Sequence, residues 1–241
     1  IGDNAILIEL GSGSSTKTRT LLNVLESPAA YVPIDISAEH LEASARSIAQ
    51  DYPGLLVIAM CANYSGDYDL PDVEGRRVGF FPGSTIGNLT RDGARELLAD
   101  WRKRLGPDSL MIIGVDLKED KDRLEAAYDD AAGVTAEFIT NILARANREL
   151  GADFDLSDFD YDSRYNEEAG RIEMRLRSTR DQTVKLGDQQ VELAKGEAIH
   201  VENSHKYAVD EFEKLARSAG YEPVACHTDP DRLFSLHILA T

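Results

Sequence analysis

The sequence is poor in cysteine, in positive charge and in long apolar runs. Its only cysteines are Cys61 and Cys226, with no C-x-x-C pair, so buried free thiols are expected rather than a disulfide or a cysteine-bound metal. The 26 Lys and Arg residues are outnumbered by 43 Asp and Glu residues, which gives a net charge of −17. A chain of that sign repels nucleic-acid backbones and anionic membranes, so neither is expected as a partner.

No stretch approaches the ~18 consecutive apolar residues of a membrane span, and no signal peptide opens the chain, which predicts a cytoplasmic protein. The five histidines lack metal-ligand spacing, so no metal site is expected. The acid-rich stretch 153–162 lacks the Gly turn and terminal Glu of a calcium loop, and it is interpreted as a solvated acidic connection. Hydrophobic residues make up 42% of the chain, enough for one large domain or for a core with an insertion.

Short apolar runs alternate with helical patterns in the first half of the chain. Strands are predicted at residues 5–10, 31–36, 55–60, 78–81 and 110–115, and helices at 16–25, after Ser37 as an N-cap, and at 90–105. This alternation predicts an α/β fold with a mostly parallel, doubly wound sheet. Pro33 is unusual inside a strand and indicates either the start of a strand or an irregularity there.

The pattern changes after this core. Helices are predicted at 121–132 and 135–150, a strand with one solvated face at 171–178, and a hairpin of 183–186 with 190–193. A helix at 209–219 and strands at 221–227 and 233–240 resume the α/β pattern. The predicted division is a core of residues 1–117, an inserted α+β subdomain of 118–204, and the end of the core at 205–241 with two antiparallel edge strands.

A glycine-rich turn joins the first predicted strand to the first helix. Gly11 and Gly13 let the backbone approach a ligand there, and Asp35 at the end of the second strand can accept hydrogen bonds from a ribose diol. The dinucleotide pattern needs a third glycine where Thr16 stands, so NAD(P) is the less favoured alternative. Glu9, two residues before Gly11, is similar to the acid of S-adenosylmethionine (SAM) methyltransferases, so SAM is the expected cofactor.

Asn63 and Tyr64 follow the third predicted strand. By analogy with the SAM-binding fold, the side chain after that strand reaches the adenine amine, whose hydrogen the Asn63 carbonyl could accept. The alternative is that Asn63 is only a turn residue.

Several longer strings are unusual. They are Glu9-Leu10-Gly11-Ser12-Gly13, Lys17-Thr18-Arg19, Phe81-Pro82-Gly83-Ser84-Thr85-Ile86-Gly87-Asn88, Gly114-Val115-Asp116-Leu117-Lys118, Ala127-Tyr128-Asp129-Asp130 and Asn147-Arg148-Glu149-Leu150. Together they closely resemble the histidine-specific Nα-methyltransferases of ergothioneine biosynthesis, from Ile6 to the C-terminus. The resemblance implies a Rossmann-like class I SAM methyltransferase core with an inserted substrate-recognition subdomain. It also implies methylation of the α-amine of L-histidine up to the trimethylated betaine, hercynine.

The resemblance also assigns residues. The positions that match cofactor contacts are Gly11, Gly13, Lys17, Asp35, Asn63 and Tyr64, although the family has Asp where Asn63 stands. Asn88 and Tyr128 match residues that hold the amino-acid head group, and they are the implied catalytic residues. Glu202 and Ser204 match residues that bind the imidazole, and Met174 matches a residue of the pocket wall.

Each substrate assignment has a structural alternative. Asn88 could only end a turn, Tyr128 could pack at the edge of a core, and Glu202 with Ser204 could lie on a solvated strand face. Taken singly these alternatives are favoured, and only the joint match to the family reverses them.

Two other functions remain open. One is a related methyltransferase for another amino acid or an indole amine, although Glu202 beside an indole would lack a second ring nitrogen to satisfy. The other is a non-catalytic SAM-binding core fragment. The family's N-terminal helical region supplies a tyrosine to the substrate site, and this sequence opens at Ile1 without it, so we expect a truncated N-terminus. The expected partner is a small-molecule substrate, an amino acid. The protein itself is expected to be an acidic monomer.

Overall fold

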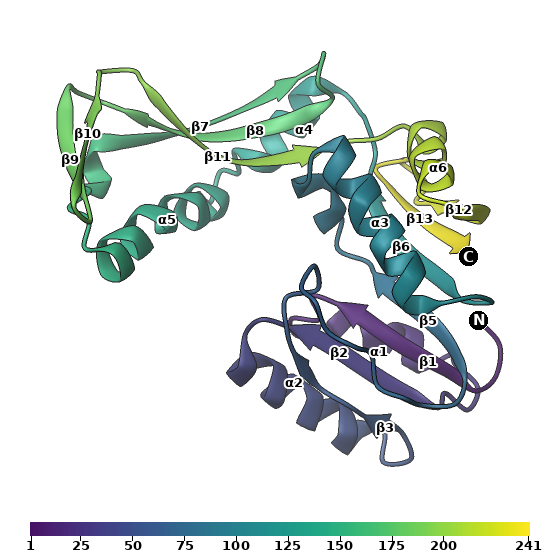
Figure 1. Ribbon diagram of the computed structural model, residues 1–241. Coiled ribbons are helices and arrows are strands. Elements are labelled where there is room, and N and C mark those ends of the chain that lie inside the picture. Colours follow the sequence, from purple (N-terminus) through teal and green to yellow (C-terminus); the bar gives the residue numbers. More distant parts are fainter. The chain divides into compact units, whose positions relative to one another are not determined.

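The computed structural model describes all 241 residues, which divide into two units (Figure 1). Unit 1 comprises Ile1–Leu117 and Tyr207–Thr241, and unit 2 comprises Lys118–Lys206. The insertion therefore ends after Lys206, slightly later than the predicted Ser204. Leu117 and Tyr207 pair in a parallel bridge, so the chain leaves unit 1 and returns to it at adjacent points.

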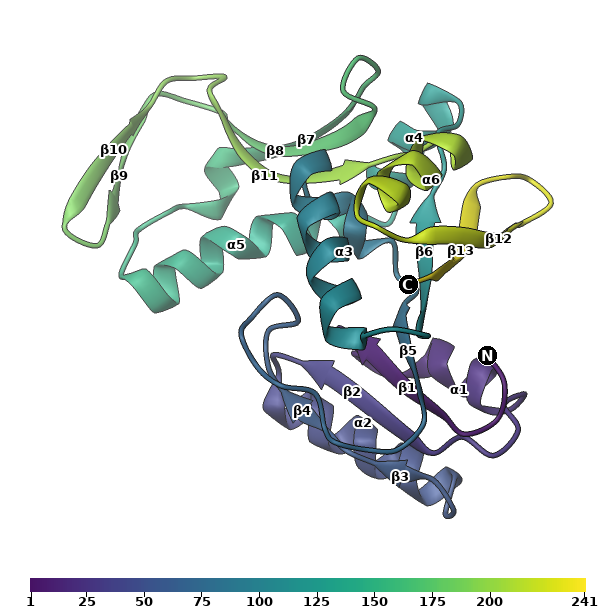
Figure 2. The ribbon, with the colours of Figure 1, turned by 45° about the vertical axis from the view of Figure 1, so that its right-hand side comes forward.

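Unit 1 is built on one sheet in the order β12-β13-β6-β5-β1-β2-β3, with β4 also paired to β2 (Figure 2). Its strands are β1 (Ala5–Leu10), β2 (Ala30–Asp35), β3 (Leu56–Val57), β4 (Met60–Cys61), β5 (Arg76–Phe81), β6 (Leu110–Asp116), β12 (Glu222–Thr228) and β13 (Phe234–Ala240). Strands β1 to β6 pair in parallel, whereas β13 is antiparallel to both β6 and β12. The predicted mostly parallel, Rossmann-like sheet is confirmed, and so is its antiparallel end.

Helices cover both faces of this sheet. They are α1 (Thr16–Leu22), α2 (Ala38–Asp51), α3 (Arg91–Leu105) and α6 (Val209–Ser218). Alternate residues of β1 point to opposite faces, so Ile6 and Ile8 join a cluster with Trp101 of α3, while Leu7 joins a cluster with Ile48 of α2. Helix α1 is shorter than predicted and ends at Leu22, where the Asn23 N–H turns back to the carbonyls of Arg19 and Leu21.

Pro33 explains why the third predicted strand is split. In the parallel pairing of β2, Ala30 and Tyr31 face β3, and Ile34 and Asp35 face β4, with no ladder between them. Pro33 lies in that gap and has no N–H to donate. The sheet therefore keeps its register on both sides of the proline, and the irregularity expected from the sequence is confirmed.

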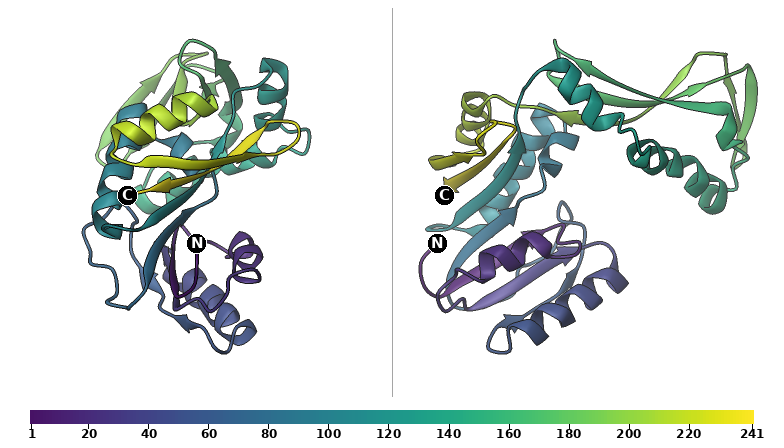
Figure 3. Two further views of the ribbon diagram at one scale, coloured as in Figure 1. Left: turned by 90° about the vertical axis from the view of Figure 1, so that its right-hand side faces the viewer. Right: turned by 180° about the vertical axis from the view of Figure 1, so that it is seen from behind.

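Unit 2 combines two helices with a three-stranded antiparallel sheet, in the order β11-β8-β7, and a separate hairpin (Figure 3, teal to light green). Its elements are α4 (Lys121–Tyr128), α5 (Val134–Leu150), η2 (Leu156–Asp158), β7 (Phe159–Asn166), β8 (Arg171–Ser178), β9 (Gln182–Leu186), β10 (Gln189–Leu193) and β11 (Ala198–His205). Every second residue of β8 is buried, and Ile172, Met174 and Leu176 share a core with Leu124 of α4 and Ile139 of α5. The predicted β9–β10 hairpin is confirmed.

Three predictions about these elements are wrong. Helix α4 ends at Tyr128 and not at residue 132, because the Asp130 carboxylate accepts hydrogen bonds from the N–H groups of Val134 and Thr135 and so caps α5. The acidic stretch 153–162 is not wholly a loop, since β7 begins at Phe159. Both cysteines are free as expected, but Cys61 is exposed and Cys226 only half-buried. None of the helices is long and apolar enough to cross a membrane.

Candidate active site

The glycine-rich turn between β1 and α1 exposes its backbone at the carboxyl end of the sheet, where folds of this type bind ligands. Gly11 and Gly13 adopt left-handed conformations with φ of 66° and 50°, which glycine adopts without steric cost. The N–H groups of Gly11 and Ser12 both donate to the carbonyl of Ile34, at 2.9 and 3.1 Å, and fix the turn against β2. The turn is thereby held in place by its own backbone.

Asp35 connects this turn to the start of α2. Its Oδ2 accepts from the N–H of Gly13 at 3.0 Å, and its Oδ1 accepts from the N–H of Ser37 at 2.9 Å. Each carboxylate oxygen keeps a second acceptor position, which is what a ribose diol requires. Ser37 occupies the N-cap position as predicted, but its side chain makes no capping hydrogen bond.

A buried polar atom beside the turn has no partner within the protein. The Ser12 hydroxyl is buried and makes no hydrogen bond, although buried hydroxyls are nearly always paired. A polar group of a bound ligand can supply the hydrogen-bond partner that this hydroxyl lacks. Left-handed glycines, an acid with spare acceptor positions and an unpaired hydroxyl all fit an adenosine-type cofactor such as SAM.

Tyr64 lies beside the turn, and Asn63 is held in a turn of its own. A Cβ placed on Gly11 would lie 3.8 Å from Cε1 of Tyr64, and the Tyr64 carbonyl accepts from the Trp101 indole at 3.0 Å. The Asn63 Oδ1 accepts from the N–H and the hydroxyl of Ser65, at 3.1 and 2.8 Å. Both acceptor positions of that oxygen are therefore used, so in this geometry Asn63 has N–H donors to offer an adenine ring rather than an acceptor for its amine.

Lys17 lies close to the loop that follows β5, and Asn88 lies where the segment after that loop ends. The Lys17 Nζ is 4.0 Å from a Cβ placed on Gly83, so this exposed side chain reaches that loop. The loop is anchored to β6 because the N–H of Asp116 donates to the Ser84 hydroxyl at 2.9 Å. Asn88 ends the short helix η1 (Thr85–Asn88), at the same end of the sheet as Asp35.

Glu9 forms a buried network that the sequence motif did not reveal. Its carboxylate accepts from the Thr18 hydroxyl at 2.5 Å and from the Tyr31 hydroxyl, and Tyr31 also contacts Ser15 at 2.8 Å. Burial raises the pKa of Glu9 to about 6, against an ordinary value of 4.5, and burial together with the Glu9 charge raises the pKa of Tyr31. The network ties β1, α1 and β2 together beneath the turn.

Glu9→Gln is expected to remove a pH dependence of stability. The pKa of Glu9 is higher in the folded protein than in the unfolded chain, so the protonated carboxyl stabilises the fold. This contribution is complete below about pH 4.5 and is lost as the pH rises through about 6. Between pH 4.5 and pH 8, the free energy of unfolding of the wild type should fall by about 2 kcal/mol relative to that of Glu9→Gln. Glutamine keeps a carbonyl that can accept from Thr18 and Tyr31, and it never ionises. Urea unfolding at both pH values measures this. The exposed Glu26→Gln is the control, and an equal stability difference at both pH values would contradict the interpretation.

Unit 2 brings two of its predicted residues into direct contact. Tyr128 ends α4 and Ser204 lies near the end of β11, yet their hydroxyl oxygens are 2.8 Å apart across a sequence separation of 76. The Tyr161 hydroxyl donates to the Tyr128 carbonyl at 2.9 Å and so anchors the end of α4 to β7.

Glu202 and Ser204 lie on the packed face of their sheet. In the β8–β11 pairing, Glu202 faces Met174 and Ser204 faces Ile172, both of which are buried. Directly opposed residues share a face, so the alternative of a solvated face is wrong for this strand. Glu202 is half-buried and Ser204 is buried. Of the predicted substrate residues, four therefore lie in unit 2, and Asn88 lies in unit 1.

Lys206 is a residue of this cluster that the sequence analysis missed. Its Nζ donates to the Tyr128 hydroxyl at 2.7 Å and to the Ser204 hydroxyl at 3.0 Å. The only sign in the sequence was its position two residues after Ser204 and one residue beyond the end of β11, where a lysine is normally solvated.

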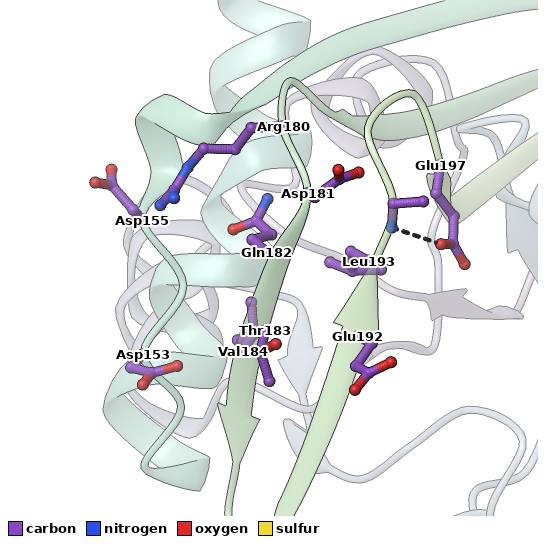
Figure 4. A pocket seen from close by; sticks show the side chains of 11 residues that line it. Asp153, Asp155, Arg180, Asp181, Gln182, Thr183, Val184, Glu192, Leu193 and Glu197 are labelled. Carbon is purple, nitrogen blue, oxygen red and sulfur yellow. Dashed lines mark hydrogen bonds between the residues drawn. The ribbon is translucent and has the colours of Figure 1, made fainter.

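A hollow in unit 2 contains none of the predicted residues (Figure 4). It lies between the β9–β10 hairpin and the segment that carries Asp153 and Asp155, and most of its charged residues are acidic. Arg180 on its rim pairs with Asp158 at 2.6 Å, and the N–H of Ala194 donates to Glu197 at 3.0 Å. No group of three or more His, Cys, Asp and Glu side chains in the protein is arranged to hold a metal ion.

The comparisons with known proteins match the whole chain, or nearly all of it, to methyltransferases. The sequence profile of a family described as histidine-specific, SAM-dependent methyltransferases matches residues 1–241. The chain is 39% identical over 237 residues to a histidine N-alpha-methyltransferase of Mycolicibacterium smegmatis, covering 96% of this chain and 74% of that protein. It is 38% identical over 239 residues to a protein of the same name from Mycobacterium tuberculosis, covering 97% of this chain and 74% of that protein.

A solved structure supports the fold. The CcbJ methyltransferase from Streptomyces caelestis is similar with a TM-score of 0.54 at 16% identity, covering 100% of this chain and 89% of that one. At that identity the similarity shows a shared methyltransferase fold and nothing about the substrate.

Proposed function

Because the chain belongs to the family of histidine-specific, SAM-dependent methyltransferases, we propose that it transfers methyl groups from SAM to the α-amine of L-histidine. The observation that supports this most directly is the shared packed face of Glu202 and Ser204. A neutral imidazole offers one N–H donor and one nitrogen acceptor, and a carboxylate beside a hydroxyl complements that pair. The proposed end product is the trimethylated betaine.

Unit 1 would hold the cofactor, which supplies an electrophilic methyl group on a sulfonium when bound. The backbone of Gly11 and Gly13 would lie against it, and Asp35 would accept hydrogen bonds from its ribose. Tyr64 and Asn63 would lie on the adenine side, with Asn63 donating to a ring nitrogen. Lys17 would approach the cofactor from α1, beside the loop at Gly83.

Methyl transfer from a sulfonium is an in-line displacement, so the protein contributes mainly by orienting the attacking amine. The amine must be neutral to attack. The Asn88 carbonyl would accept one amine hydrogen and direct the lone pair, and the Tyr128 phenol would donate to the substrate carboxylate. Met174 would form the apolar wall beside the imidazole held by Glu202 and Ser204.

The setting and the assembly are also proposals. Two free cysteines support a reducing, cytoplasmic setting, where thiols stay unpaired. The net charge of −17 supports a monomer, because like-charged copies repel each other. Light scattering at physiological salt tests the second point, and a stable dimer would contradict it.

The substrate assignment is tested by titrating L-histidine into protein saturated with S-adenosylhomocysteine, followed by turnover with SAM. Saturable binding and methylation of histidine, with no binding of L-tryptophan, would support the proposal. Binding of S-adenosylhomocysteine with tryptophan but not histidine would favour the related amine methyltransferase. Cofactor binding with turnover on neither amine would favour a non-catalytic SAM-binding protein.

A further inference from the structure

Lys206 is a buried charge that the proposed chemistry does not use. It is 1% exposed, and its Nζ donates to the hydroxyls of Tyr128 and Ser204 at 2.7 and 3.0 Å. The same Nζ lies 4.6 Å from the centre of the Tyr128 ring. Lysine is rarely fully buried unless its donors are satisfied, so its position in this cluster asks for an explanation.

The protons of the cluster can be assigned from the donor capacity of each group. An ammonium has only donors, so both hydroxyl oxygens must accept from Lys206. The two hydroxyls also hydrogen-bond to each other at 2.8 Å, which uses the hydrogen of one of them. The second hydroxyl then accepts twice, from Lys206 and from its neighbour, and its own hydrogen remains available. Whichever hydroxyl plays that part, the cluster presents one O–H donor and a positive charge.

We propose that Lys206 is a positioning residue that leaves one hydroxyl of the Tyr128–Ser204 pair to donate toward an acceptor atom of the amino-acid substrate. The matching acceptors of histidine are its carboxylate oxygens and its unprotonated ring nitrogen. This rests on the proposed function, because it takes histidine as the ligand.

The charge of Lys206 adds a second form of selection. In a protein of net charge −17, an anionic carboxylate is repelled on average, and a fixed ammonium offsets that repulsion locally. Hydrogen bonds that involve an ionised partner are also the stronger ones. Lys206 therefore favours a free amino acid over an uncharged analogue of it.

The test compares L-histidine with L-histidinamide, which keeps the α-amine and the imidazole but lacks the carboxylate charge. Both are titrated into protein saturated with S-adenosylhomocysteine, for the wild type and for Lys206→Met. The methionine variant should bind histidine at least about tenfold more weakly and histidinamide with a smaller loss, so that the preference for histidine shrinks. Affinity for S-adenosylhomocysteine should stay unchanged.

Three further variants make the outcome decisive. Lys185→Met, on the exposed side of β9, should behave as the wild type. Lys206→Gln is measured alongside because it keeps N–H donors and so folds more readily than a buried methionine, and it should lose the same preference. Tyr128→Phe combined with Lys206→Met should cost less than the sum of the two single losses, since both act on one hydrogen bond.

The outcomes separate the two ideas. A wild type that binds no histidine overturns the proposed function and this inference with it. A wild type that binds histidine, with a folded Lys206 variant whose preference for histidine over histidinamide is unchanged, overturns this inference alone. An equal loss for both ligands also overturns it, because that is the result expected of a general structural role.

Discussion

Replacing Glu202 by alanine is expected to lower kcat/KM for histidine about a hundredfold or more, with SAM affinity unchanged. Glu202 faces the buried Met174 across the β8–β11 pairing, on the strand face that also carries Ser204. Without the carboxylate, an imidazole N–H would be left unsatisfied, and the loss of a charged hydrogen bond is worth about 1.5–3 kcal/mol before that penalty. The residues proposed to bind SAM all belong to unit 1, so the affinity of the protein for SAM should not change.

Steady-state kinetics on both substrates measures this, with calorimetry of S-adenosylhomocysteine as the check on unit 1. Glu192→Ala, an exposed acid on β10 of the same unit, is the matched control for the lost charge. Glu202→Gln separates charge from hydrogen bonding, because its amide oxygen still accepts, and it should retain part of the activity. Wild-type histidine kinetics in Glu202→Ala would remove this residue from the substrate site.

The core of unit 1 could be predicted because its strands are short and apolar and its helices begin at recognisable residues. Thr90 is one such residue, and its hydroxyl does accept from the N–H of Gly93 at the start of α3. The sequence pattern was weaker in unit 2. Strand β7 alternates Phe159 and Tyr161 with the acids Asp160 and Asp162, and the acids favoured a loop in the interpretation, although Asp162 is paired with Arg177 at 2.7 Å.

Gly11, Gly13, Asp35 and Asn63 follow from local rules, because each lies at the end of a strand or in the turn after it, whereas Lys17, which lies on α1, was assigned only through the family resemblance. The contact between Tyr128 and Ser204 could not be found in this way, since no periodicity links residues so far apart. Lys206 was missed for a related reason. A lysine next to a strand end is normally solvated, and only its two hydroxyl partners show otherwise. The burial of Glu9 likewise depends on Tyr31, which comes from the neighbouring strand.

Gly114→Ala is expected to lower the free energy of unfolding by about 3 kcal/mol and to lower kcat as well. A Cβ at this position in β6 would lie 2.4 Å from the carbonyl oxygen of Pro82 and 2.4 Å from the Phe234 ring. The ring can turn, but the Pro82 oxygen is backbone, and it begins the loop that ends at Asn88. The strain should therefore pass into the part of the site proposed to orient the amine.

Gly79→Ala on the neighbouring strand β5 is the matched control for this effect. A Cβ there would meet the Sδ and Cε of Met111 at 2.9 Å, and the end of a methionine side chain moves easily, so a loss of about 1 kcal/mol is expected. Urea unfolding of both variants, with kcat measured under native conditions, makes the comparison. Equal stability of the two variants would mean that the Pro82 backbone yields as readily as a side chain. In that case the loop before Asn88 is not held by β6, and the orientation of the amine must depend on another part of unit 1.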